Sequence, residues 1–186
     1  MTGFKEKANL AMKELQEVFE LMDDSYIREL LEAVKSHRRI FTIGAGREGL
    51  STKAFAMRLT HLGKESHWIW DDTTPALGTG DLLIAVCGPG HIDTIDQVVR
   101  YAKGHGAVIA VISAAESGYC VEQADIVMKL PAAAYRASGK FVETKQPMGN
   151  LFEQALFIVF DVIVMMASEE MGIPEAEMVA RHRNIE

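Results

Sequence analysis

The sequence predicts an α/β fold, a three-layer sandwich in which helices flank a parallel sheet. First, short runs rich in aliphatic residues alternate with helical patterns along most of the 186 residues, an order typical of such folds. Second, the runs 40–43, 82–86 and 108–112 are almost continuously apolar, as strands are when both faces of a parallel sheet are covered. Right-handed crossovers are expected to join these strands.

The expected elements follow one another in a regular order. Two helices are predicted within residues 4–37, separated at Asp23–Ser25. Strands are predicted at 39–43, 65–70, 82–86, 108–112 and 126–130, and helices at 49–62, 92–105, 116–123 and 151–171. Pro174 suits the first turn of a last short helix over 174–184. The chain has neither an internal repeat nor a linker, so residues 1–186 are expected to form one domain.

Composition and charge exclude several classes of function. The formal net charge is −7 and the pI is about 5.4, which argues against a nucleic-acid partner and against binding to an anionic membrane surface. We expect no segment apolar and long enough to span a membrane, and no signal peptide. Cys87 and Cys120 do not have metal-ligand spacing, so a reduced, cytoplasmic protein is expected.

Two glycine-rich turns follow predicted strands, Gly44-Ala45-Gly46-Arg47 after the first and Gly88–Gly90 after the third. Ligands of parallel sheets bind beyond the carboxyl ends of the strands. A turn of this kind, followed at once by a helix, points backbone N–H groups at one spot and favours an anion such as phosphate. The alternative for Gly44 and Gly46 is tight packing of strand against helix.

The predicted helix 151–171 is apolar almost all round. Such a helix must be buried on most sides, and one sheet can cover only one face. We therefore expect a subunit interface along this helix. The alternative is that the N-terminal helices of the same chain cross it.

Five stretches, in order, resemble the sugar isomerase (SIS) domain family, and within it the 6-phospho-3-hexuloisomerases. They span nearly the whole chain, and the ordered set is specific although the first stretch alone is weak. They are residues 44–47; 54–59 with 61–63; 73–76 with 80–84; Pro147-Met148-Gly149 with Leu151-Phe152-Glu153; and the tail 181–186.

The resemblance implies a five-stranded parallel sheet, a homotetramer with sites near subunit contacts, and a phosphorylated ketohexose as substrate. Family members interconvert a 6-phospho-3-ketohexose and fructose 6-phosphate through an enediol(ate), which requires neither a metal nor another cofactor. The residues that the resemblance assigns to substrate binding are Gly44, Gly46, Arg47, Cys87, Gly88, Pro89, Gly90, His91, Ile92 and Thr94.

Glu153 is the expected catalytic base, because it matches the proton-accepting Glu of the family's Pro-Met-Gly-x-Leu-Phe-Glu stretch. One positioned carboxylate can remove a proton from one carbon and return it to the next. Taken alone, Asn150 followed three residues later by Glu153 is typical of a helix N-terminal cap, and both roles can hold. Arg47 is the expected phosphate ligand because its guanidinium suits phosphate oxygens; the alternative is a surface arginine.

His61 and His182 match histidines that the family carries at these places, which implies help with ring opening or carbonyl polarisation. His61 falls on a helical stripe with Leu50, Ala54 and Met57. A lone histidine on an apolar face is more often an interior or interface residue, so that alternative stays open for both.

The second turn departs from the family. Family members have a Ser-Gly-Ser-Gly-Glu-Thr run, whereas this chain has Cys87-Gly88-Pro89-Gly90-His91-Ile92. The hydroxyls are lost, Pro89 removes a backbone donor, and Thr94 is the nearest hydroxyl left. Glu48 stands where the family commonly has Ser, and a carboxylate there repels phosphate unless it turns away or pairs with Arg47. A cationic His91 is one possible compensation.

Two other functions fit parts of the sequence. A non-catalytic phosphosugar-binding or regulatory module is favoured by the altered second turn. A dinucleotide-dependent oxidoreductase is suggested by Gly44, Gly46 and Gly49, which approximate G-x-G-x-x-G, with an acid at Asp71 or Asp72 after the second strand. Nothing later in the chain resembles a dehydrogenase site, so this function ranks third.

Overall fold

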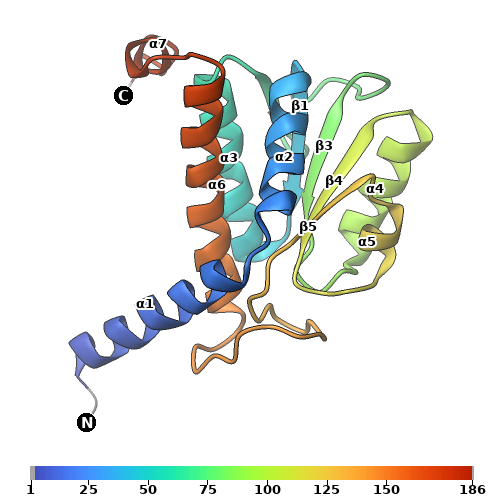
Figure 1. Ribbon diagram of the computed structural model, residues 1–186. Coiled ribbons are helices and arrows are strands. Elements are labelled where there is room, and N and C mark those ends of the chain that lie inside the picture. The colour runs from blue at the N-terminus through green and yellow to red at the C-terminus, as the bar shows by residue number, and fades with distance from the viewer. Residues whose placement is uncertain (1–2, 186) are drawn as a thin grey trace.

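Five parallel strands form the middle layer of the protein, in the order β2-β1-β3-β4-β5. The computed structural model describes residues 3–185 and confirms the predicted three-layer sandwich (Figure 1). The strands are β1 (Arg39–Gly44), β2 (Glu65–Trp68), β3 (Leu82–Val86), β4 (Val108–Ser113) and β5 (Ile126–Lys129). The helices are α1 (Phe4–Leu21), α2 (Asp24–Ser36), α3 (Gly46–His61), α4 (Asp93–Gly104), α5 (Tyr119–Gln123), α6 (Asn150–Glu170) and α7 (Glu175–Ala180).

The strand register brings the two glycine-rich turns to the same edge of the sheet. Strand β1 pairs with β3 so that Ile40 faces Leu82 and Gly44 faces Val86. The turns after Gly44 and after Val86 therefore begin side by side at the carboxyl ends of neighbouring strands, where ligands of such sheets bind.

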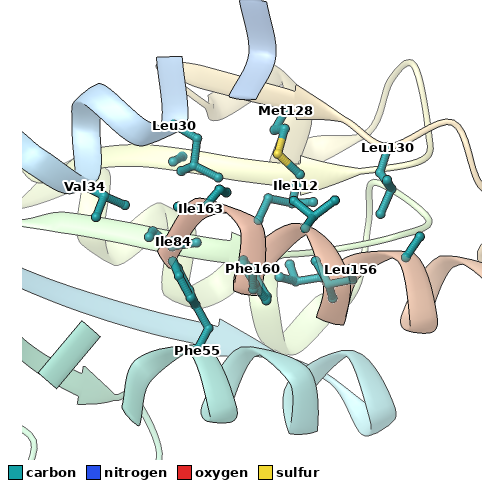
Figure 2. Packing of buried hydrophobic residues seen from close by; sticks show 14 of the residues in the cluster. Leu30, Val34, Phe55, Ile84, Ile112, Met128, Leu130, Leu156, Phe160 and Ile163 are labelled. Carbon is teal, nitrogen blue, oxygen red and sulfur yellow. The ribbon is translucent and has the colours of Figure 1, made fainter. Parts of the chain in front are cut away.

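Helices cover the two faces of the sheet unequally. Helices α2, α3 and α6 lie over one face and α4 and α5 over the other (Figure 1). Figure 2 shows the larger core, which includes Ile84, Phe55 and Phe160. The Phe55 and Phe160 rings stack with their centroids 4.2 Å apart. Successive strand residues point to opposite faces, so Leu83 joins the second core, with Val99 from α4.

Helix α6 contradicts the expectation that no segment is apolar and long enough to span a membrane. It is long and apolar enough to span a membrane by length and composition, with a mean hydropathy of 1.9, although half of that window is buried inside the fold. Its buried side includes Leu156 and Ile163 in the large core (Figure 2). Phe157, Val162 and Met165 are 46%, 41% and 62% exposed. The helix thus presents an apolar outer face, as its all-round apolar pattern predicts.

Several helix ends differ from the predicted bounds. Asp23 caps α2 by accepting a hydrogen bond from the Ser25 N–H at 2.8 Å. The predicted break at Asp23–Ser25 is therefore the N-terminal cap of the second helix. Helix α5 begins at Tyr119 and not at residue 116, because Gly118 has a φ of 133°, outside the helical region. The last helix is shorter than the predicted 174–184, and Glu186 of the quoted tail lies outside the described residues.

Helix α1 projects from the body at its N-terminal end (Figure 1), and Glu14 ties it to the segment that precedes α6. The Glu14 carboxylate accepts hydrogen bonds from the Thr144 hydroxyl at 2.7 Å, the Lys145 N–H at 3.0 Å and the Gln146 amide at 3.0 Å. Burial opposes the charge, but these hydrogen bonds outweigh it and hold the pKa of Glu14 below its ordinary value.

Candidate active site

The first glycine-rich turn brings strand β1 and helix α3 into direct backbone contact. A Cβ on Gly44 would lie 3.0 Å from the Gly49 Cα, and one on Gly49 would lie 2.7 Å from the Gly44 carbonyl oxygen. Close packing therefore accounts for both glycines without requiring a dinucleotide. Gly46 has a φ of 55° and begins α3, so its left-handed backbone turns the chain into the helix.

A cavity of about 770 Å³ opens at this edge of the sheet. Parts of the first turn, the second turn, the segment before α6 and the start of α6 meet there. Its lining consists of Ala45, Gly46, Arg47, Glu48, Pro89, His91, Ile92, Asp93, Thr94, Tyr135, Arg136, Met148 and Glu153. The structure thus brings Glu153 together with Arg47 and part of the predicted substrate-binding set.

Glu153 lies in the first turn of α6, but the predicted cap is wrong. Gly149 is the cap residue, with a left-handed φ of 82°, and its carbonyl accepts the Glu153 N–H at 3.2 Å. Asn150 is already inside the helix, and its side chain accepts a hydrogen bond from the Arg47 guanidinium at 2.5 Å. Neither side chain caps the helix; Asn150 binds Arg47, and Glu153 lines the cavity.

Arg47 contacts the Glu153 carboxylate, with its Nη1 2.9 Å from Oε2. The alignment is not that of a hydrogen bond, and this buried Oε2 accepts none from any described residue. Burial raises the pKa of Glu153 above its ordinary value, while the Arg47 charge partly opposes the shift. A partly buried carboxylate with a raised pKa and an oxygen that accepts no hydrogen bond has the properties of a general base.

Glu48 is 8% exposed and turns toward the second turn instead of pairing with Arg47. Its Oε2 accepts a hydrogen bond from the Gly88 N–H at 3.0 Å. Burial raises the pKa of Glu48 to about 7; the hydrogen bond from Gly88 opposes the rise and the charge of Glu153 adds to it. At neutral pH this carboxyl is therefore partly protonated.

The backbone donors of the second turn are almost all engaged within the protein. The Cys87 N–H donates to Ile112 O at 3.0 Å, and the Gly90 N–H donates to Cys87 O at 2.9 Å. The Ile92 N–H lies 3.4 Å from Asp96 Oδ1, the Gly88 N–H serves Glu48, and Pro89 has none. Four predicted substrate-binding residues do not line the cavity, namely Gly44, Cys87, Gly88 and Gly90.

His91 is held by acidic neighbours. Its Nδ1 is hydrogen-bonded to the buried Asp96, and its Nε2 lies 3.5 Å from Asp93 Oδ1. Asp96 also accepts a hydrogen bond from the Cys120 thiol at 2.9 Å. Cys87 contributes most to raising the pKa of Cys120, followed by burial.

His91, Asp93 and Asp96 offer metal-ligating atoms within 4.8 Å of one another. Asp96 is already hydrogen-bonded to His91 and Cys120, so the geometry assigns no ion to the three residues.

The two predicted histidines lie together, at the other edge of the sheet. The rings of His61 and His182 are 5.1 Å apart, and both line a second cavity of about 490 Å³. Helix α3 begins beside the Glu153 cavity and ends at His61, 16 residues in all, and a rise of about 1.5 Å per residue separates its two ends by roughly 20 Å. One chain therefore does not bring either histidine to Glu153.

Sequence reasoning missed Tyr135 and Arg136, which also line the first cavity. They lie in the irregular segment between β5 and α6, where no motif or periodicity marks them. A Cβ on Gly149 would lie 2.6 Å from the Tyr135 N. Tyr135 and Arg136 are thus placed by a tertiary contact between their segment and the residue before α6. No local sequence pattern can reveal such a contact.

Comparison with known proteins adds to this geometry. The SIS domain family matches residues 33–158. The 3-hexulose-6-phosphate isomerase of Bacillus subtilis is 34% identical over 85% of both chains, and that of Mycobacterium gastri is 32% identical over 96% of this chain and 89% of its own. A Methanococcus jannaschii protein, whose crystal structure was described as inferring a molecular function of 3-hexulose-6-phosphate isomerase, is 28% identical. It has a TM-score of 0.83 and covers 97% of this chain and 99% of its own. The chain belongs to the SIS domain family.

Proposed function

We propose that this protein isomerises a phosphorylated ketohexose, and most specifically that it interconverts 3-hexulose 6-phosphate and fructose 6-phosphate. The observation that carries the proposal is the Glu153 carboxylate, which lines a cavity at the carboxyl edge of the sheet and whose buried Oε2 faces Arg47 but accepts no hydrogen bond from any described residue. The names of the relatives in Bacillus subtilis and Mycobacterium gastri support the same reaction. In class it is an intramolecular oxidation and reduction of neighbouring carbons.

In the proposed mechanism, Glu153 takes the proton from C2 of the 3-ketose, and the C2–H electrons form the enediolate double bond. The same carboxyl then returns the proton to C3, and the O2 proton passes to O3, so that a carbonyl forms at C2 and a hydroxyl at C3. Burial suits Glu153 to this exchange because it raises the pKa of the carboxyl, toward the pH at which the enzyme would work. Arg47, 2.9 Å away, fixes the carboxylate and limits that shift.

His61 and His182 enter this proposal only through a second copy of the chain, because they lie at the opposite edge of the sheet in one chain. The exposed apolar side chains of α6 supply a surface for such an assembly. A homotetramer in the cytoplasm is the form we propose, in line with the resemblance.

The test is to incubate the protein with fructose 6-phosphate in deuterated water and to follow the sugar protons by NMR. Exchange at C3 with appearance of the 3-ketose is the expected result, because Glu153 would exchange its proton with solvent between removal and return. Exchange at C1 instead would mean an aldose–ketose isomerase. No exchange at either carbon would overturn the proposal.

A second function is favoured by the second turn, whose backbone donors are engaged within the protein. A binding or regulatory module would hold a phosphosugar without converting it. Fructose 6-phosphate that binds in calorimetry but shows no exchange in the NMR experiment would identify this function.

A further inference from the structure

The cavity needs a place for the phosphate of the substrate, and residues 87–90 of the second turn offer it no free backbone N–H. Its Gly88 N–H is 3.0 Å from the Glu48 carboxylate, which therefore occupies a donor that a phosphate would use. Pro89 has no N–H, and the N–H groups of Cys87 and Gly90 donate to carbonyl oxygens. Since a backbone N–H makes one strong hydrogen bond, a phosphate at this turn would meet Glu48 instead of donors.

Three basic side chains line the cavity, and two of them already face acids. Arg47 contacts Glu153 and Asn150, and His91 lies between Asp93 and Asp96. Arg136 has neither an ion pair nor a hydrogen bond to any residue in the described range 3–185. Its guanidinium carbon lies 5.1 Å from the centre of the Tyr135 ring, a stacking that leaves the N–H edge of the guanidinium free for an anion.

The backbone fixes where Arg136 begins. The residues just before it lie between the two active-site loops, because a Cβ on Gly88 would lie 2.7 Å from the Ala134 Cβ and one on Gly149 would lie 2.6 Å from the Tyr135 N. Arg136 itself has a φ of 62°, which is uncommon for a residue with a Cβ. The surrounding contacts thus hold the chain in a bend that places Arg136 on the cavity.

We propose that Arg136 is the phosphate anchor of this enzyme, with Thr94 at the same cavity, in place of the backbone of the second turn. The inference rests on the proposed function, because it assumes that the ligand is a phosphosugar. A guanidinium makes two parallel charge-assisted hydrogen bonds to phosphate oxygens. Asp93, Glu48 and Glu153 also line the cavity, and negative charge on them disfavours a phosphate in contact with them.

The test compares R136Q with the wild type and with K140Q, a matched control because Lys140 is an exposed cation of the same segment that does not line the cavity. We expect KM for fructose 6-phosphate to rise about 30-fold in R136Q, with kcat changed less than threefold, because the anchor binds a group remote from the reacting carbons. R136K should recover part of the loss, since it keeps the charge without the fork. K140Q should match the wild type.

A second measurement separates this inference from the proposed function. Calorimetry with inorganic phosphate and with fructose 6-phosphate, on E153Q and on E153Q with R136Q, measures binding where turnover is blocked. Weaker binding of both ligands in the double variant supports the anchor even if no isomerisation is found. Equal affinity in the two variants, or no phosphate binding by E153Q, would overturn it. Thermal melting of every variant checks that the fold is kept.

Discussion

The two glycine-rich turns begin side by side at one edge of the sheet, yet they differ in what they offer a ligand. The first presents Gly46 and the side chain of Arg47 to the cavity. The second places Gly88 and Gly90 beneath the surface, and its donors serve the protein itself. The difference teaches that glycines in such a turn can be required by packing while the N–H groups of residues 87–90 are engaged within the protein.

The largest expected effect comes from E153Q, which tests the proposed base beside the first turn. A glutamine cannot accept the C2 proton, so kcat should fall by about a thousandfold or more. Binding of fructose 6-phosphate should persist. Steady-state kinetics and calorimetry measure both, and E143Q is a control because Glu143 does not line the cavity. A kcat within tenfold of the wild type would contradict the assignment of the base.

E48Q tests the contact between Glu48, next to the first turn, and Gly88 in the second turn. The quantity measured is the free energy of unfolding. The folded pKa of Glu48, about 7, is above its ordinary value of 4.5, so the folded state retains a proton that the unfolded state has lost. The free energy of unfolding should therefore fall as pH rises from about 4.5 to 7, by up to about 3 kcal/mol. In E48Q this contribution should disappear. Urea denaturation at pH 5 and pH 8 measures the difference, and parallel pH dependence in both proteins would contradict it.

G88A breaks the second turn at its tightest point. The added Cβ would lie 2.5 Å from Glu48 Oε1 and 2.7 Å from the Ala134 Cβ, so either the carboxyl or the 134–135 segment must move. We expect a loss of about 2 kcal/mol in the free energy of unfolding. G104A is the control, because a Cβ there meets nothing within 4 Å and should leave stability unchanged or slightly raised. Equal stability of the two variants would show that the turn is loosely packed.

The smallest effect is expected from E48S, which makes the second turn more like the first. The Gly88 N–H would be released to the cavity, and one hydrogen bond to a charged group is worth about 1.5 kcal/mol or somewhat more. The affinity for inorganic phosphate should therefore rise about tenfold in calorimetry. E48Q is the matched control, because its amide oxygen still accepts the Gly88 N–H. Equal affinity of E48S and E48Q for phosphate would show that releasing the Gly88 N–H does not create a phosphate donor.

The fold could be predicted from the sequence because its evidence is periodic. The buried strands 82–86 and 108–112 are apolar on both faces, and 40–43 is nearly so, a pattern typical of strands in a parallel sheet. The cap of α6 was predicted wrongly because Asn150 and Glu153 have cap spacing, whereas Gly149 takes the cap with a left-handed backbone. The spacing does not show that Arg47 claims the Asn150 side chain.

The candidate site could be predicted only where a motif marks it. Glu153 and Arg47 were found through their motifs and do line one cavity. Arg136 was missed because its position depends on contacts of Ala134 and Tyr135 with two distant glycines. The separation of His61 from Glu153 follows from the length of α3, so the sequence contained that information and the resemblance obscured it.

Glu14 gives the projecting helix α1 a consequence for protein engineering. Its three hydrogen bonds hold residues 144–146, which immediately precede the bend that starts the helix of the proposed base. A truncated version lacking the first 21 residues would keep every strand and the whole cavity lining, yet would release the segment that orients Glu153. Affinity tags are therefore better placed at the other terminus, and the shortest useful version of this protein begins before residue 14.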